Sequence, residues 1–316
     1  MTLSMNERAA ALVDALVADA DALAIGVRTL ESGARLVDCG ARAAGGLQAG
    51  LGFAAACLGG LGRIDPIAVA VGERIWPGVG VAVDQPATAC LAAQYAGWKL
   101  EHGKFFAMAS GPGRALARAE ELFDELAWRE HADHAVLCLE TRDEPPQEIV
   151  EKVAQRCGVQ PAALTFVIAA TASVCGSVQI SARVVETALH KLHELGVDPA
   201  RVRSGWGCCP IAPVAADDPA AIGRTNDAVL YGGTVHLRID APDEEVADLA
   251  QRLPSSASEA FGTPFGELLA AADWKFYEID PMLFSPAAVT LTSTESGRAH
   301  HGGGLAPEVL ERSFTT

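Results

Sequence analysis

Apolar residues recur along this chain with two different periods, and these periods predict helices that alternate with strands. Residues 6–24 show the three- to four-residue spacing of an amphipathic helix. Residues 27–38 alternate apolar and polar positions on both sides of Ser32-Gly33, which predicts a β-hairpin. A short apolar run predicts a buried strand at 135–140, and further strands are predicted at 164–169 and 234–239. Helices are predicted at 147–157, 178–195, 243–252 and 264–272. Because strands and helices interleave throughout, the sequence predicts a mixed α/β (α+β) fold.

Glycine and proline modify this picture in two places. The run at 40–62 is so rich in glycine that an ordinary helix is not expected there. It predicts closely packed backbone, or loops near a ligand or a neighbouring subunit, with an irregular core of small residues as the alternative. Residues 64–83 are strand-like, but Pro66 and Pro77-Gly78 interrupt the pattern.

The length of the chain and one proline-containing segment predict two domains. A chain of 316 residues, half of them apolar, is long enough to bury two cores of ordinary size. Residues 141–147 are charged and carry two prolines, which is typical of a linker. This linker gives an N-terminal α/β domain at 1–145 and a C-terminal α/β domain at 146–316. Domains that are discontinuous in sequence remain an alternative.

The net charge restricts the expected partners. The chain has 24 lysines and arginines against 40 aspartates and glutamates, so its net charge is −16. This charge repels nucleic acid and anionic membranes at long range, but it does not exclude a small anionic ligand, because a pocket sets its own local field. No segment has the unbroken apolar stretch of a membrane helix, and the N-terminal residues lack the basic start of a secretory signal. We therefore expect a cytoplasmic protein that binds neither nucleic acid nor membrane.

The cysteines and histidines do not form the pattern of a metal site. The eight cysteines are scattered without a CxxC spacing, which argues against a zinc knuckle. In a long chain without an export signal we expect them to be free, buried thiols. The vicinal Cys208 and Cys209 are the exception, since a redox or metal role there stays open. The histidine pairs lack a convincing third ligand, so no metal site is expected.

Arg183 and Glu186 form the first candidate site. They stand three residues apart in the predicted helix at 178–195, so their side chains are neighbours on one face. The alternative is a solvated surface ion pair. The preceding small-residue stretch, TASVCGSVQ, leaves room for a ligand and offers backbone N–H donors near a helix N-terminus.

The segment 210–233 is the second candidate. It reads PIAPVAADDPAAIGRTNDAVLYGG and combines Arg224, Asn226 and Asp227 with glycines on both sides. This composition is typical of a polar binding loop. The alternative is a proline-rich connection whose aspartates and asparagine cap turns.

At these residues the chain resembles the methenyltetrahydromethanopterin cyclohydrolase family, over nearly its whole length and in family order. The blocks that carry the resemblance are DCGARAAGGLQAG, DQPATACLAAQYAGW, FFAMASGPGRALA, AVLCLE, ATASVCGSVQISARVVETALHKL, PIAPVAADDPAAIGRTNDAVLYGGTVHL, LPSSASEAFG and FYEIDPMLFSPA. The chain departs from the family pattern at Cys208 and Cys209, where small or hydroxyl residues are usual, and in its richness in alanine. Because that richness suits a mesophilic bacterium, the dephosphorylated bacterial pterin is the expected form of the substrate.

The resemblance implies a two-domain subunit with the active site in a cleft between the domains, and a homotrimer. It implies that Arg183 and Glu186, in the RVVE block, are catalytic. It also implies a pterin as substrate carrier, with no prosthetic group and no metal. The substrate-binding residues that it suggests are Ser110, Arg114, Glu140, Gln179, Arg224, Asn226 and Asp227.

The reaction implied by the resemblance fits such a pair. The methenyl carbon bridges two nitrogens as a delocalised cation and is already electrophilic, so the enzyme mainly has to place and deprotonate one water. On this hypothesis Glu186 accepts the proton of the water, Arg183 fixes the carboxylate, and the ring opens reversibly to an N5-formyl product. A cyclohydrolase for methenyl-folate and a non-catalytic pterin-binding protein are the two alternatives.

Overall fold

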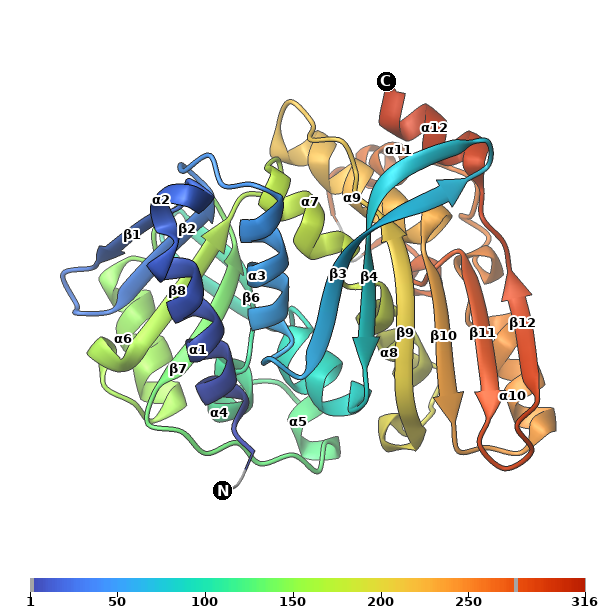
Figure 1. Cartoon of the computed structure of the whole chain (residues 1–316), viewed down its shortest axis with the longest axis horizontal. Coiled ribbons are helices and arrows are strands. Elements are labelled where there is room, and N and C mark those ends of the chain that lie inside the picture. Colours follow the sequence, from blue (N-terminus) through green and yellow to red (C-terminus); the bar gives the residue numbers. More distant parts are fainter. Residues whose placement is uncertain (1–2, 276–277, 316) are drawn as a thin grey trace. The chain divides into compact units, whose positions relative to one another are not determined.

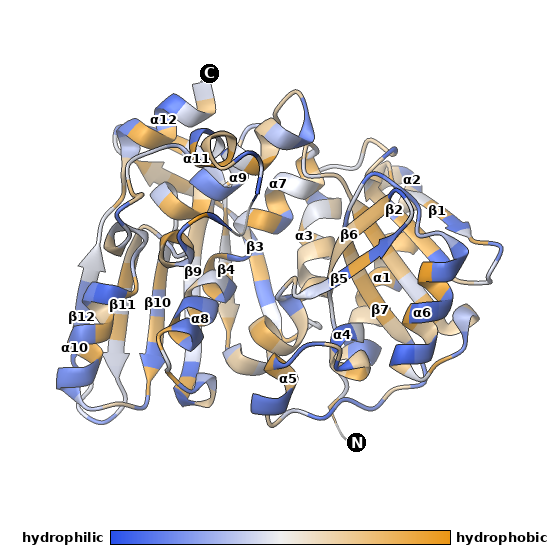
Figure 2. Ribbon diagram, turned by 180° about the vertical axis from the view of Figure 1, so that it is seen from behind, coloured by the Kyte–Doolittle hydropathy of each residue, from blue (hydrophilic) through white to orange (hydrophobic). Residues whose placement is uncertain are grey.

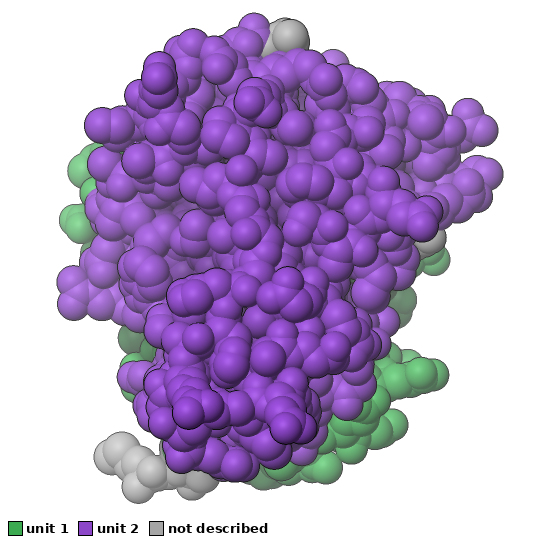
Figure 3. All heavy atoms as spheres, turned by 90° about the vertical axis from the view of Figure 1, so that its right-hand side faces the viewer, with its two compact units in different colours: residues 1–62, 88–179 green, residues 63–87, 180–316 purple. Residues whose placement is uncertain are grey.

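The computed structural model describes residues 3–275 and 278–315, and in it the chain packs as two compact units (Figure 1). Unit 1 consists of residues 1–62 and 88–179, and unit 2 of residues 63–87 and 180–316, as coloured in Figure 3. Each unit is therefore discontinuous in sequence, and residues 141–147 lie within unit 1. The predicted boundary after residue 145 stays a prediction, as does the predicted cleft. Phe276 and Tyr277, which begin the last block of the family resemblance, lie outside the described residues.

Helices and two six-stranded sheets confirm the mixed α/β fold class. The sheet of unit 1 has the strand order β1-β2-β8-β7-β6-β5. Strands β2, β8 and β7 run parallel to one another. Strand β1 pairs antiparallel with β2, β6 pairs antiparallel with β7, and β5 pairs antiparallel with β6. In chain order, the strands are β1 (Gly26–Thr29), β2 (Arg35–Gly40), β5 (Trp98–His102), β6 (Phe105–Ser110), β7 (Ala135–Glu140) and β8 (Leu164–Ala169).

Both faces of the unit 1 sheet are buried. On β7, Leu137 belongs to a core cluster that includes apolar residues of α6, while Val136 belongs to a second cluster that includes residues of α1 and α3. This opposite placement of neighbouring residues follows from the two-residue period of a strand. The helical elements of this part of the chain are α1 (Met5–Ala18), α2 (Ala20–Leu23), α3 (Leu47–Cys57), the π-helix η1 (Ala87–Gln94), α4 (Gly113–Ala117), α5 (Leu122–Glu125), α6 (Gln147–Cys157), the 3-10 helix η2 (Pro161–Ala163) and α7 (Val174–Ser181).

The expectation that the glycine-rich run 40–62 forms no ordinary helix is wrong, because α3 occupies its centre. Two of its glycines lie where the helix meets close neighbours. A Cβ atom on Gly50 would stand 2.7 Å from the Cβ of Val178, and one on Gly52 would stand 2.6 Å from a methyl group of Leu16. A larger residue at position 50 would require Val178 or the helix to shift, which accounts for a glycine there despite the cost of about 0.5–1 kcal/mol that glycine carries in a helix.

The sheet of unit 2 has the order β12-β11-β10-β9-β4-β3. Helix α8 packs against β9 and β10, and α10 packs against β11 and β12. Both helices lie on the same face of the sheet, and Figure 2 shows their outward sides with many hydrophilic residues. The strands are β3 (Gly62–Val71), β4 (Arg74–Val83), β9 (Val202–Pro210), β10 (Thr234–Ile239), β11 (Ala288–Ser293) and β12 (Ala299–Gly303). The helical elements are α8 (Val184–Glu194), η3 (Pro199–Arg201), α9 (Asp218–Gly232), α10 (Asp243–Arg252), η4 (Ser255–Ala257), α11 (Phe265–Ala271), η6 (Pro281–Leu283) and α12 (Pro307–Thr315).

One predicted strand interruption is absent, and one predicted helix is interrupted. Pro66 lies within β3, which an edge strand tolerates because one side of its backbone has no partner strand. The predicted helix at 178–195 is two helices, since α7 ends at Ser181 and α8 begins at Val184. The chain passes from unit 1 to unit 2 within α7.

The structure bears on two expectations from the sequence, those for the cysteines and for a membrane-spanning helix. All eight cysteines are thiols outside disulfides, and all except Cys208 are buried. Within residues 3–275 and 278–315, no helix is both long and apolar enough to cross a membrane.

Candidate active site

Arg183 and Glu186 lie at the start of α8 and pair with each other. The Arg183 Nη1 atom is 3.4 Å from Glu186 Oε2, and the two side chains are only 14% and 7% exposed. The pair is therefore not the solvated surface pair that remained an alternative from the sequence. Glu186 occupies the first turn of α8, where the N-terminal end of the helix dipole favours a carboxylate.

The interruption between α7 and α8 places Arg183 and Glu186 at the start of a helix. Before the break, the Ser181 hydroxyl donates to the carbonyl of Pro210 (2.8 Å), and after it the Thr187 hydroxyl donates to the carbonyl of Arg183 (2.9 Å). Helix α8 also lies very close to β9, because a Cβ atom on Gly207 would stand 2.8 Å from a methyl group of Val184. The absence of a side chain at Gly207 therefore allows the start of α8, with Arg183 and Glu186, to lie close to the sheet.

Lys191 is a third buried charge on α8, and sequence analysis missed it. It is 1% exposed, and its Nζ atom donates to the carbonyls of Pro254 (2.8 Å) and Met282 (2.5 Å). Burial lowers the pKa of its ammonium group to about 8. These bonds fasten α8 to the segments around η4 and η6, which belong to two blocks of the family resemblance.

In unit 1, Glu140 and Gln179 meet at the carboxyl ends of parallel strands. Glu140 ends β7, and Gln179 Nε2 donates to its Oε2 atom at 3.0 Å. The hydroxyl of Thr171, two residues after β8, donates to Oε1 at 2.5 Å. The structure therefore brings two of the predicted binding residues together and adds Thr171, which the sequence gave no reason to select.

The same edge of the sheet carries a tight loop after β2. The buried carboxylate of Asp38 accepts four backbone N–H groups, from Gly40 and Ala41 on Oδ1 (3.0 and 2.7 Å) and from Arg42 and Ala43 on Oδ2 (2.9 and 3.0 Å). A carboxylate that satisfies four donors holds the loop in one conformation. Asp38 thus shapes the edge on which Glu140 lies.

Ser110 and Arg114, also in unit 1, are buried in the protein. Ser110 ends β6 at 2% exposure. The guanidinium of Arg114 is wholly buried, pairs with Glu120, and lies between the rings of Tyr95 and Phe123, each 5.3 Å from ring centre to guanidinium carbon. Its Nη1 atom also donates to two carbonyls at the end of η1. These contacts give Arg114 a structural task, and its predicted contact with substrate stays a prediction.

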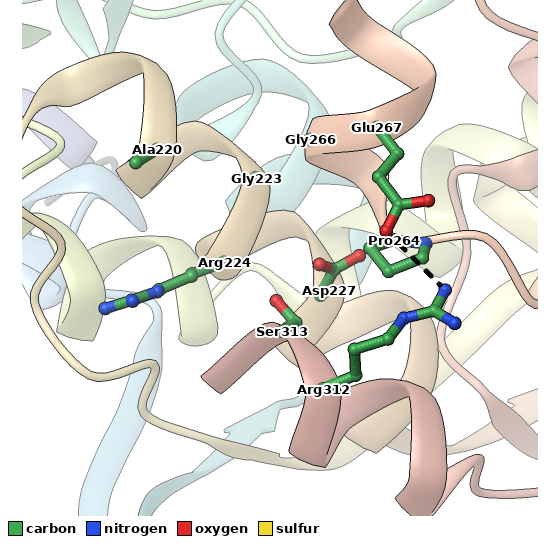
Figure 4. Close-up of a pocket in the computed structure, with 9 residues that line it drawn as sticks. All are labelled: Ala220, Gly223, Arg224, Asp227, Pro264, Gly266, Glu267, Arg312 and Ser313. Atoms are coloured by element: carbon green, nitrogen blue, oxygen red, sulfur yellow. Dashed lines mark ion pairs between the residues drawn. The ribbon is translucent and has the colours of Figure 1, made fainter. Parts of the chain in front are cut away.

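Arg224, Asn226 and Asp227 lie on helix α9, so the expectation of a polar binding loop at these three residues is wrong. A pocket of about 250 Å³ opens beside them (Figure 4), lined by Ala220, Gly223, Arg224, Asp227, Pro264, Gly266, Glu267, Arg312 and Ser313. In Figure 4 Asp227 and Ser313 face each other, whereas Arg224 extends away from them. The Asn226 amide is bonded to the carbonyl of Ile222 in its own helix (2.8 Å).

Asp227 joins three helices and has an unusual pKa. Its Oδ1 atom accepts the backbone N–H of Phe265, at the start of α11 (2.7 Å), and it is hydrogen-bonded to Ser313 of α12. Burial raises the pKa of this carboxyl to about 7, despite the opposing effect of the two hydrogen bonds. A buried carboxyl that titrates near neutrality beside a pocket is a candidate functional group.

Replacing Asp227 with asparagine is expected to change how stability depends on pH. The folded protein holds this proton up to about pH 7, whereas the unfolded chain releases it near pH 3.8. The carboxyl therefore favours the folded state below about pH 4, and this contribution is lost as the pH rises to 7. Relative to the parent protein, the free energy of unfolding of Asp227→Asn should rise between pH 4 and 7, by on the order of 3–4 kcal/mol in total.

Urea unfolding at pH 4 and at pH 7 measures this difference. Asp248→Asn, on the exposed side of α10, is the control for removing one negative charge elsewhere in unit 2. Parallel changes in Asp227→Asn and the parent protein at the two pH values would contradict the prediction.

No cluster of three or more histidine, cysteine, aspartate or glutamate side chains is arranged to hold a metal ion in the part of the chain that the structure describes. The two vicinal thiols occupy successive positions of β9, so their side chains point to opposite faces of the sheet. Burial raises the pKa of both thiols, which disfavours the thiolate.

Comparison with known proteins places the chain in a family of enzymes. The model of the family described as "Cyclohydrolase (MCH)" matches residues 4–314, so the chain belongs to this family of cyclohydrolases. The methenyltetrahydromethanopterin cyclohydrolase of Xanthobacter autotrophicus is 48% identical, over 99% of this chain and 93% of that protein. The protein of the same name from Methylobacterium sp. (strain 4-46) is 49% identical, over 98% and 97%. An archaeal relative of that name, from Methanococcoides burtonii, is 38% identical over 99% and 98%.

Proposed function

We propose that this chain hydrolyses N5,N10-methenyl-tetrahydromethanopterin, or its dephosphorylated bacterial form, to the N5-formyl derivative. The observation that carries the proposal is the shielded Arg183–Glu186 pair at the start of α8, in a chain nearly half identical to relatives named for this reaction. A carboxylate with so little exposure, next to one guanidinium, is suited to act on a water that has been separated from bulk solvent.

In the proposed reaction Glu186 is the general base. The methenyl carbon shares its positive charge with two nitrogens, so attack by water needs a base more than it needs a stronger electrophile. Glu186 takes a proton from the attacking water as the C–O bond forms. It then gives a proton to the departing N10 as the C–N10 bond breaks. The hydroxyl group of the adduct releases its proton to solvent as the C=O bond forms, which leaves the formyl group on N5. The same residue serves both directions of the reaction.

Arg183 orients the base in this scheme. Its guanidinium lies within 3.4 Å of the Glu186 carboxylate and compensates part of the charge, so the pair presents little net charge to a cationic substrate. The helix start adds a fixed dipole that favours the ionised carboxylate. No step of this scheme requires a metal ion, because the substrate carbon is already electrophilic.

The remaining features of the proposal concern substrate form and assembly. Several bacterial relatives that carry this enzyme name come from the genus Methylobacterium, which supports the bacterial pterin as substrate. We further propose that the protein acts in one-carbon metabolism in the cytoplasm, as a homotrimer without a prosthetic group. Sedimentation of the purified protein tests the trimer.

Loss of the methenyl chromophore tests the activity. Purified protein should hydrolyse methenyl-tetrahydromethanopterin, in the presence as well as the absence of a chelator. Activity that disappears with the chelator would overturn the metal-free reaction. Faster turnover of methenyl-tetrahydrofolate would replace the proposed substrate, and binding without any turnover would identify the chain as a pterin-binding protein.

A further inference from the structure

Lys191 joins helix α8 to two segments that are distant in the sequence. It is 1% exposed, and its Nζ atom donates to the carbonyl of Pro254 (2.8 Å), next to η4, and to that of Met282 (2.5 Å), within η6. All of these residues belong to unit 2, as do Arg183 and Glu186. The buried ammonium group is therefore a fixed point of attachment on the helix that carries the proposed base.

Lys191 and Glu186 lie on opposite flanks of α8. The side of the helix that bears Val184 and Val185 faces the glycines of β9. At about 100° per residue, Lys191 and Glu186 are about 140° apart around the axis, with this sheet-facing side between them. Apolar contacts are non-directional, so packing on the sheet constrains the rotation of the helix less than hydrogen bonds on one flank do.

A small rotation of α8 is enough to disturb the catalytic candidates. Side chains extend to about 5–6 Å from a helix axis, so a rotation of about 10° moves their ends by about 1 Å. A displacement of about 1 Å at a reacting group can lower a rate about 100-fold. The two bonds of Lys191 oppose such a rotation, and both are strengthened by the charge of the ammonium group.

We propose that Lys191 is a positioning residue for the cyclohydrolase reaction, because it fixes the rotation of α8 and thereby the place of the Arg183–Glu186 pair. This inference rests on the proposed function for the role of the pair. Lys191 acts through the helix and takes no part in the chemistry. A lysine suits this task because its ammonium group offers three donors, whereas an apolar side chain of the same length offers none.

The charge of Lys191 is sensitive to pH. Burial lowers the pKa of its ammonium group to about 8, and the carboxylate of Asp280, just before η6, opposes this shift. Neither η4 nor η6 contains an ionisable side chain. On α8 itself, Glu194 stands one turn further on, but its side chain is 44% exposed and pairs with His190. Above about pH 8 the amine is neutral and loses the charge that strengthens both bonds, so the attachment of α8 weakens.

The pH dependence of turnover tests this role. After subtraction of the uncatalysed reaction, the turnover number of the parent protein for methenyl-tetrahydromethanopterin should fall about threefold or more between pH 7 and pH 9. The midpoint of this fall should lie near pH 8. Lys191→Met has a similar length and no charge, so it should be about 10- to 100-fold slower at pH 7 and should lack the alkaline fall. The substrate concentration for half-maximal rate should change much less.

Two further variants separate positioning from folding. Asp280→Asn keeps Lys191 and can still accept the backbone N–H of Met282, but it lacks the charge that favours the ammonium form. The midpoint of its alkaline fall should therefore move to lower pH. Lys152→Met, at an exposed position of α6, is the matched control and should keep the parent profile. Thermal unfolding shows whether each variant is folded, and Asp280→Asn decides the question if Lys191→Met does not fold.

Hydrogen exchange of α8 gives a readout that does not depend on activity. In Lys191→Met the backbone amides of this helix should exchange faster than in the parent. Unchanged turnover in Lys191→Met, or an alkaline midpoint that is the same in Asp280→Asn and the parent, overturns the inference even if the methenyl substrate is hydrolysed. Faster exchange of α8 in Lys191→Met, with a parent protein that never hydrolyses this substrate, supports the attachment by Lys191 and overturns the cyclohydrolase proposal.

Discussion

Glu186→Gln is expected to reduce the turnover number of the cyclohydrolase reaction by about 10²- to 10⁴-fold, the usual contribution of a general acid–base group. Glutamine has nearly the same shape and can still receive a hydrogen bond from Arg183, but it cannot accept a proton from water at neutral pH. Because the substrate would still fit, its dissociation constant should change much less than turnover. Single-turnover loss of the methenyl absorbance, together with equilibrium binding, measures the two quantities separately.

Glu194→Gln is the control on the same helix. Glu194 lies at the last residue of α8, and its side chain is 44% exposed, so turnover should stay close to that of the parent. If Glu186→Gln kept a third or more of the parent turnover, the role of Glu186 as base would have to be abandoned.

Arg114→Ala is expected to have the largest effect on stability, lowering the free energy of unfolding by about 3–5 kcal/mol. The substitution leaves the Glu120 carboxylate, only 12% exposed, without its ion-pair partner. It also removes the donor for the carbonyls of Leu91 and Ala93 and the group between two aromatic rings. Denaturant unfolding followed by circular dichroism measures the change.

Arg63→Ala is the comparison, because Arg63 also pairs with a carboxylate but is 79% exposed, and such surface pairs contribute little to stability. An Arg114→Ala protein that is as stable as Arg63→Ala but needs far more substrate for half-maximal rate would favour the binding role that the family resemblance suggests for Arg114.

The elements that sequence predicts best are those that the core constrains on both sides. Residues 135–140 and 164–169 form buried strands with the predicted limits, because a mainly apolar run bounded by polar residues leaves few other ways to be buried. Residues 234–239 also form a strand with the predicted limits, but its positions alternate between buried and exposed. The helix at 147–157 also has its predicted limits, since its apolar face is regular. Helix α3 was missed because the reason for its glycines is the closeness of Leu16 and Val178, which only the folded chain brings near.

Features of the candidate site that depend on neighbouring residues can be predicted from the sequence, whereas features that join distant residues cannot. The Arg183–Glu186 pair depends on a three-residue spacing, and it is therefore visible in the sequence. The break that places the pair at a helix start is not visible there, and it lies next to a hydrogen bond from Ser181 to Pro210, a residue distant in the sequence. The group formed by Glu140, Thr171 and Gln179 requires the parallel pairing of β7 with β8, and no local pattern encodes that pairing.

Strand β4 pairs with β9 in a register that joins Gly78 to Pro210, although the two residues are far apart in the sequence. During synthesis the β3–β4 hairpin therefore leaves the ribosome roughly 130 residues before its partner, a delay on the order of ten seconds at ordinary rates of translation. Throughout that time one edge of the hairpin has exposed backbone donors and acceptors, so newly made chains are vulnerable to strand pairing with one another. A single cut cannot release either unit intact, because each contains two separate stretches of the polypeptide.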